Sequence, residues 1–268
     1  MGDMLFASLS SSFAAYRKKP ISFILSTLTY LFFSLLSLLS LVGVFLICFV
    51  VLSLVKFDGE LLVLEGLGLV LSIILIYLLS AFKGALVKSY AVLSTGSNIS
   101  FLSIFRYSLS NGPVFFVLCL LKILFIVLFN LPIILFYFLY LKDNPVQYLD
   151  IVLLLAALFI TFIVEMLMFP SVIAAANGMG VGSSLSAGAK FFMRKHVLAF
   201  AIFLLYAIIW LCALSPELAS IAFLMTGQQY LLYSLIVFLP LGIMSLLVSY
   251  PIVYTAMVIF FQKYGLTK

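Results

Sequence analysis

The sequence predicts an all-α polytopic membrane protein: six transmembrane helices in three tandem hairpins, each preceded by a cytoplasmic amphipathic helix. Composition is the first observation, because 66% of the 268 residues are apolar and only 8% are charged. A soluble domain has about 25% charged residues. The other observations are six long apolar runs and basic residues gathered on alternate connections. Such a chain cannot cover a water-facing surface. A soluble enzyme, a disordered protein and a nucleic-acid-binding domain are therefore excluded, and residues 1–268 are expected to form one membrane domain.

The spans follow from the length of each apolar run. A helix needs about 20 apolar residues to cross a hydrocarbon core of about 30 Å. Several runs are longer, so their helices should tilt or project from the membrane. The first run could instead be one span plus a short interfacial piece. In order, the six predicted spans are Ile21–Val55, Leu61–Phe82, Pro113–Leu141, Ile151–Ala176, Val197–Leu214 and Leu231–Phe261.

The distribution of basic residues predicts the orientation. The N-terminal segment, the connections 83–112 and 177–196 and the C-terminal tail hold eleven Lys and Arg, and the other side holds two. Cytoplasmic loops collect positive charge, so both termini should lie in the cytoplasm, in a multi-pass protein of the plasma membrane. The net charge of +6 is thus a topology signal. We expect seven interfacial basic residues to contact anionic lipid headgroups: Arg17, Lys18, Lys19, Arg106, Lys190, Arg194 and Lys195.

The cytoplasmic segments also indicate an internal repeat. Stretches starting at Leu9, Leu102 and Leu185 each begin with Leu-Ser, continue as an amphipathic elbow and lead into an apolar run. Prolines 170 and 251, in the fourth and sixth spans, are 81 residues apart, close to the 83 that separate the ends of the second and third elbows. Approximate repeats of 1–97, 98–180 and 181–268 follow, although short Leu-Ser matches also arise by chance. Two spans per repeat give every copy the same orientation, unlike the inverted repeats of many transporters.

A resemblance is visible in this pattern. Six spans with Ser-rich elbows, and the stretch 170–176 leading to a Gly/Ser loop, resemble poorly characterised prokaryotic six-helix membrane families. One of these is the membrane domain attached to some glycerophosphodiester phosphodiesterases. In the fused proteins that domain accompanies a soluble catalytic barrel. These 268 residues hold no such barrel, so the resemblance implies a fold and not phosphodiesterase activity.

Lys122 and Glu165 are the main candidate site residues. At 1.5 Å per residue, Lys122 lies about 13 Å past Pro113 and Glu165 about 16 Å before Ala176. Both distances are measured from the cytoplasmic end of neighbouring antiparallel spans, so the two side chains lie at similar depth and a salt bridge is feasible. An ionisable residue at membrane depth is costly and suggests function. The pair could bind a proton, an ion or a lipid headgroup. A structural pair, or a lysine that extends to the headgroups, is the more common explanation of such residues.

Other polar and helix-breaking residues give weaker signals. Proline removes a helix hydrogen bond and can kink a helix, and such breaks line some substrate paths but are common in membrane helices. The sequence has one histidine, no CxxC motif and no nucleophile with a partner base, so neither catalytic residues nor a metal or cofactor is expected. The helix-kink candidates are Asn130, Pro132, Pro170, Pro240 and Pro251.

Two functions fit these features. The first is a transporter or lipid-handling permease that uses the Lys122–Glu165 pair. The alternative is a non-catalytic subunit or scaffold of a larger complex, with a protein partner or a second copy of the chain. An enzyme acting on lipid is the least favoured class, and no nucleic-acid partner is expected.

Overall fold

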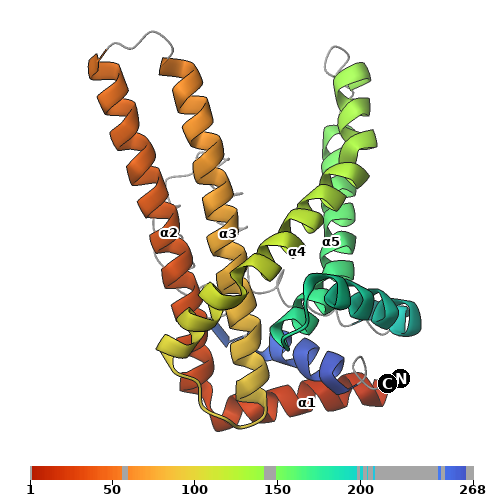
Figure 1. Ribbon diagram of the computed structural model, residues 1–268. Helices are drawn as coiled ribbons and strands as arrows, with labels where there is room; N and C mark the ends of the chain where they lie inside the picture. The colour runs from red at the N-terminus through yellow and green to blue at the C-terminus, as the bar shows by residue number, and fades with distance from the viewer. Residues whose placement is uncertain are drawn as a thin grey trace, which may run out of the picture.

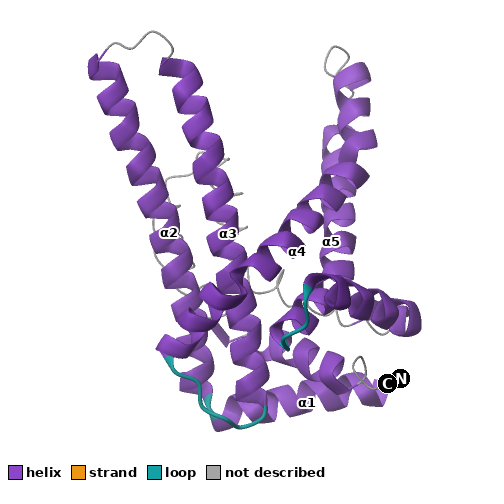
Figure 2. Cartoon of the chain, viewed as in Figure 1, coloured by secondary structure: helices purple, strands orange, loops and turns teal. Residues whose placement is uncertain are grey.

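The computed structural model describes residues 2–55, 60–141, 149–197 and 251–263, with a few single positions between 200 and 248. As predicted, the described part is helical and contains no strand (Figure 2). Helices also cover 181–197 and Pro251–Lys263. The labelled elements are α1 (Gly2–Lys18), α2 (Pro20–Val55), α3 (Glu60–Ser94), α4 (Phe101–Phe136), the π-helix η1 (Tyr137–Leu141) and α5 (Leu149–Ala176).

Four of these helices are long and apolar enough to cross a membrane. The segments are Pro20–Ser53, Val63–Ser94, Leu102–Leu139 and Leu155–Ala176. They correspond to the first four predicted spans. The predicted fifth span and residues 231–250 of the sixth lie almost wholly outside the described residues, which include only the end of the sixth, Pro251–Lys263.

The long helices form two antiparallel pairs that converge at one end (Figure 1). We call this end the base. There α1 lies across the lower ends of α2 and α3, and the helix Pro251–Lys263 lies beside α1. Away from the base, the pair α2–α3 and the pair α4–α5 diverge.

A buried aromatic core occupies the base. Phe23 and Tyr90 are fully buried, and Tyr254 packs against Phe169 with ring centroids 5.1 Å apart. The Tyr90 hydroxyl lies 2.7 Å from the Thr27 hydroxyl, so this buried polar group has a partner. Away from the base the helices expose apolar side chains, the surface that a membrane helix presents to lipid. Examples are Ile47, Leu69, Leu128 and Leu155, which are 54–66% exposed.

The structure corrects the end of the second predicted span. The apolar run stops at Phe82, but α3 continues to Ser94, so the connection predicted at 83–112 is only the segment 95–100. The extra turns form because their apolar face is buried in the base core, with Leu86 and Tyr90 as examples. The helix ends where Gly96 takes a φ of 82°, the left-handed conformation that glycine adopts at helix C-termini.

The three predicted elbows differ from one another. The first is the separate helix α1, since the chain bends at Lys19 and Pro20 starts α2. Proline suits a first helical position because its φ is fixed near the helical value. The second elbow is not separate, because α4 runs without a break through Pro113. Its N-terminus is fixed by a capping box between Ser100 and Ser103.

The third elbow lies in the helix 181–197, which follows the turn at Gly178. Gly178 has a φ of 90°. The predicted repeat boundaries, after residues 97 and 180, fall in the two loops at the base. The repeat itself stays a prediction.

Candidate functional site

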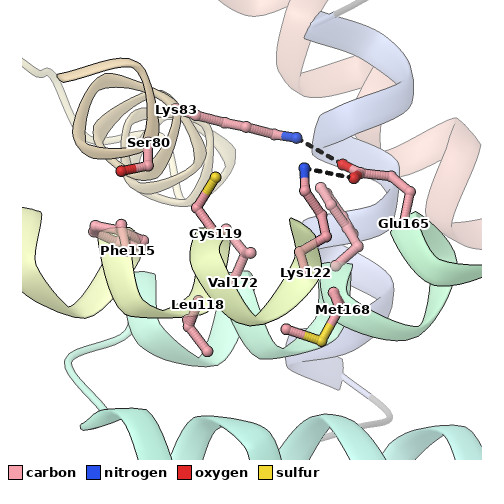
Figure 3. A pocket seen from close by; sticks show the side chains of 10 residues that line it. Ser80, Lys83, Phe115, Leu118, Cys119, Lys122, Glu165, Met168 and Val172 are labelled. Atoms are coloured by element: carbon pink, nitrogen blue, oxygen red, sulfur yellow. Dashed lines mark hydrogen bonds and ion pairs between the residues drawn. The ribbon is translucent and has the colours of Figure 1, made fainter. Parts of the chain in front are cut away.

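A charged cluster joins three of the long helices. Glu165 of α5 lies between Lys83 of α3 and Lys122 of α4 (Figure 3). The Lys83 Nζ donates to Glu165 Oε1 at 2.6 Å, and the Lys122 Nζ donates to Glu165 Oε2 at 2.8 Å. About a quarter of each side chain is exposed. We call these three residues the triad.

Close helix packing brings the two lysines to the same carboxylate. At Gly84, next to Lys83, a Cβ atom would lie 2.3 Å from the Phe115 ring. At Gly112 it would lie 2.6 Å from the Tyr77 hydroxyl. Small residues let membrane helices approach closely. The two glycines therefore allow α3 to pack closely against α4, the helix that carries Lys122.

A small cavity opens beside the triad. Its polar side carries the triad with Ser80 and Cys119, and the rest of its lining is apolar. It offers about 40 Å³ to the centres of water molecules, which is room for a few waters or the oxygen atoms of a small anion. The apolar side chains of this lining are Phe115, Leu118, Met168, Phe169 and Val172.

The triad gives the cavity a net positive charge. Two ammonium groups share one carboxylate, so the three groups carry a formal charge of +1. Hydrogen bonds between charged groups are stronger than neutral ones, and water screens them little where a site is dry. Taking charges out of water is expensive, and the attraction within a buried pair often fails to offset that cost. The triad is therefore weak evidence for added stability.

The sequence prediction found two members of the triad and missed the third. Lys122 and Glu165 were predicted at similar depth on neighbouring helices, and the structure places them in contact. Lys83 was assigned to a connection because it follows the apolar run. The one signal in the sequence was its position: Lys83 directly follows the apolar run that ends at Phe82, so one further helical turn would include it in the span.

None of the helix-kink candidates that the structure describes lines the cavity, although Pro170 directly follows the lining residue Phe169. Pro132 and Pro170 are inside α4 and α5, and Pro251 is at the first residue of the described helix Pro251–Lys263. Asn130 is buried, and its side-chain amide donates to the Ile126 carbonyl at 2.8 Å. Pro240 falls outside the described residues.

The predicted interfacial basic residues are mostly at the surface. Lys195 is half-buried. Lys19 has a structural contact, because its ammonium donates to the Gly96 carbonyl and to Asn98 Oδ1, the latter at 2.7 Å. It therefore ties the start of α2 to the end of α3. The exposed ones are Arg17, Lys18, Arg106, Lys190 and Arg194.

Within the described residues no three His, Cys, Asp or Glu side chains are grouped as metal ligands would be. His196 is exposed and lies beside the Phe192 ring. Together, these features define a helical protein whose described residues include four helices long and apolar enough to cross a membrane, three of them joined by a charged triad. Comparison with protein-family models, with curated proteins and with solved structures found no match. The resemblance to six-helix families therefore stays a prediction.

Proposed function

We propose that the protein is a six-span transporter or lipid-handling permease of the plasma membrane, and that the triad is its binding site. The observation that carries this proposal is the sharing of Glu165 by Lys83 and Lys122 beside a cavity. Ionisable residues within membrane helices are rare and commonly mark ion or substrate pathways. The six-helix resemblance is compatible with such a role.

The charge on the base supports an orientation with both termini in the cytoplasm. The exposed residues Arg17 and Lys18 lie at the end of α1, and Arg106 lies in the first turns of α4. Both short loops, 95–100 and 177–180, are at the base as well. A base rich in positive charge is the one expected to face the cytoplasm and its anionic lipids.

The length of the helices limits the depth of the triad. Helix α3 has 35 residues, a length of about 52 Å, whereas the hydrocarbon core is about 30 Å thick. Lys83 and Glu165 each lie about 16 Å from the base end of their helices at 1.5 Å per residue. The triad therefore lies between the cytoplasmic boundary of the hydrocarbon core and its midplane, within reach of the cytoplasmic leaflet.

The triad also links the two helix pairs. Lys83 belongs to the pair α2–α3, and its partner Glu165 belongs to the pair α4–α5. A ligand that competes with Glu165 for the lysines would break this link and allow the pairs to move. Binding would thereby be coupled to the opening of a path.

Reconstituted vesicles test the proposal. Transport of a fluorescent phospholipid between leaflets and release of trapped phosphate are measured for the wild-type protein, Glu165→Gln and Lys122→Met. We expect the wild type to accelerate at least one process. Each variant should slow it about tenfold or more. Lys122→Met loses an ammonium group that would hold the ligand, a charge-assisted hydrogen bond for which about 1.5–3 kcal/mol is typical. Glu165→Gln loses the carboxylate that competes with the ligand for both lysines, so the ligand should leave the site more slowly.

Lys88→Met is the matched control, because Lys88 lies on α3 as Lys83 does but belongs neither to the triad nor to the lining of its cavity. It should transport at the wild-type rate. Wild-type protein that behaves like empty vesicles in both assays would contradict the proposal, as would triad variants with full activity.

A scaffold or subunit role is the second candidate, and the surface of α1 favours it. Phe6 and Phe13 are 70% and 57% exposed. They are two helical turns apart and so share a face. Such a face can rest on lipid, on a second copy or on another subunit. Native mass spectrometry of gently extracted protein distinguishes the two candidate functions. A protein partner present in a fixed ratio would favour the scaffold or subunit role.

A further inference from the structure

The ligand of the triad can be narrowed to one chemical class. From its geometry we infer that Lys83 and Lys122 bind a phosphate-type oxyanion, which takes the place of the Glu165 carboxylate between them. The inference rests on the proposed role of the triad in ligand binding. It adds the identity of the ligand group and gives Glu165 the role of an internal competitor.

The first step is the match between the carboxylate and a phosphate. Glu165 uses both of its oxygens, one toward each ammonium, at 2.6 and 2.8 Å. A phosphate monoester, a phosphodiester or inorganic phosphate presents a similar pair of negatively charged oxygens. Lysine binds phosphate as a point charge and imposes no planar geometry, so two lysines suit a tetrahedral oxyanion.

The second step is the size and lining of the cavity. Its space of about 40 Å³ admits the oxygens of a phosphate but not a large hydrophilic solute. Its apolar wall, with Phe115 and Leu118 as examples, suits the uncharged part of a lipid better than a sugar or an amino acid. The same oxyanion could belong to an anionic phospholipid headgroup or to free phosphate.

The third step is electrostatic. Two ammonium groups near each other repel, and a shared anion relieves that repulsion. In the structure Glu165 supplies the anion. A ligand oxyanion must displace it, so the Glu165 charge lowers the affinity for the ligand. Removing that charge should strengthen binding, which is the opposite of what a purely structural role predicts.

Binding is measured on delipidated full-length protein in neutral detergent. Inorganic phosphate is titrated while the thermal unfolding midpoint is followed. In a second measurement, the protein is placed in nanodiscs that contain both phosphatidylglycerol and phosphatidylcholine and is then released from them. Native mass spectrometry counts how many molecules of each phospholipid remain bound to it. We expect Glu165→Gln to lower the Kd for the bound oxyanion about tenfold. The double variant Lys83→Met/Lys122→Met should raise that Kd about tenfold or more, because loss of a charge-assisted hydrogen bond to the ligand brings a change of this size. Lys88→Met, which removes an ammonium group of α3 outside the cavity, should leave the Kd unchanged.

The two sources give different results, and each supports the inference. Selective retention of phosphatidylglycerol without a phosphate effect identifies a lipid headgroup, and a midpoint shift with phosphate identifies the free anion. If the double variant does not fold, Lys122→Gln replaces it, because it leaves the Lys83–Glu165 pair intact. Unchanged or weaker binding by Glu165→Gln would overturn the inference, as would absence of binding of both probes.

The vesicle assay separates this inference from the proposed function. Transport that depends on the triad without oxyanion binding would overturn the inference and leave the proposed function standing. Oxyanion binding with the predicted variant pattern, but without transport, would overturn the proposed function alone.

Discussion

The three charged side chains of the triad make a prediction about stability. Glu165→Met leaves Lys83 and Lys122 facing each other without their shared carboxylate, and unpairing a buried charge typically costs about 3–5 kcal/mol. The triad is a quarter exposed, so the loss should lie at or below the lower end of that range. We expect a clear fall in the thermal unfolding midpoint of the purified protein.

The triple variant with methionine at positions 83, 122 and 165 should recover the wild-type midpoint. Replacing a whole buried ion cluster with apolar residues of similar volume is often neutral or stabilising. If the triple variant were instead less stable than Glu165→Met, the triad would be structural. Stability that is recovered together with lost transport would show that the charges are kept for ligand binding.

At the scale of elements, the helix 181–197 packs closely against α5 at Gly188. A Cβ at Gly188 would lie 2.1 Å from Ser171 Oγ and 3.0 Å from the Ser171 backbone nitrogen. The serine hydroxyl can turn aside, but the backbone cannot. We expect Gly188→Ala to destabilise the protein by about 1–3 kcal/mol, the usual cost of overpacking, as a lower midpoint in thermal unfolding.

Gly182→Ala is the matched control in the same helix. No atom lies within 4 Å of a Cβ at Gly182. Alanine favours helix by up to about 1 kcal/mol over glycine, so the midpoint should stay or rise slightly. Equal effects of the two substitutions would show that the contact with Ser171 does not hold the helix in place.

Helix boundaries show where sequence reasoning succeeds and where it fails. Apolar runs of sufficient length predicted the four described spans, because length and hydropathy alone qualify a helix to cross the membrane. A charged residue ends a hydropathy run but does not end a helix. Thus α3 passes Lys83 and stops only at the glycine turn, Gly96. The Thr95–Gly96 dipeptide was the signal that could have placed this end.

The triad was only partly predictable for the same reason. The depth of Lys122 and Glu165 followed from counting residues along two neighbouring spans. Lys83 required knowing that α3 continues beyond its apolar run and that Gly84 lets it approach α4. That approach is a property of packing between helices, which periodicity in a single segment does not encode.

At the scale of the whole molecule, the buried core and the exposed basic residues of the described part are concentrated at the base. The aromatic core around Tyr90, the end of α1 with Arg17 and Lys18, and both short loops lie there, while the opposite ends of the long helices expose apolar side chains. If the base faces the cytoplasm, Lys83 and Glu165 lie nearer the cytoplasmic leaflet than the outer one.

Cysteine accessibility tests this topology. In a variant without Cys48, Cys119 and Cys212, single cysteines are introduced as Ser97→Cys, in the loop at the base, and as Asn144→Cys, in the connection predicted to lie outside. A membrane-impermeant maleimide applied to intact cells should label the cysteine at position 144 and not that at position 97. Inverted membrane vesicles should give the reverse pattern. Labelling of position 97 from outside would place the basic surface on the wrong side for the positive-inside rule and would overturn the proposed orientation. Because Lys83 and Glu165 lie nearer the base ends of α3 and α5, the same result would also place the triad nearer the outer leaflet.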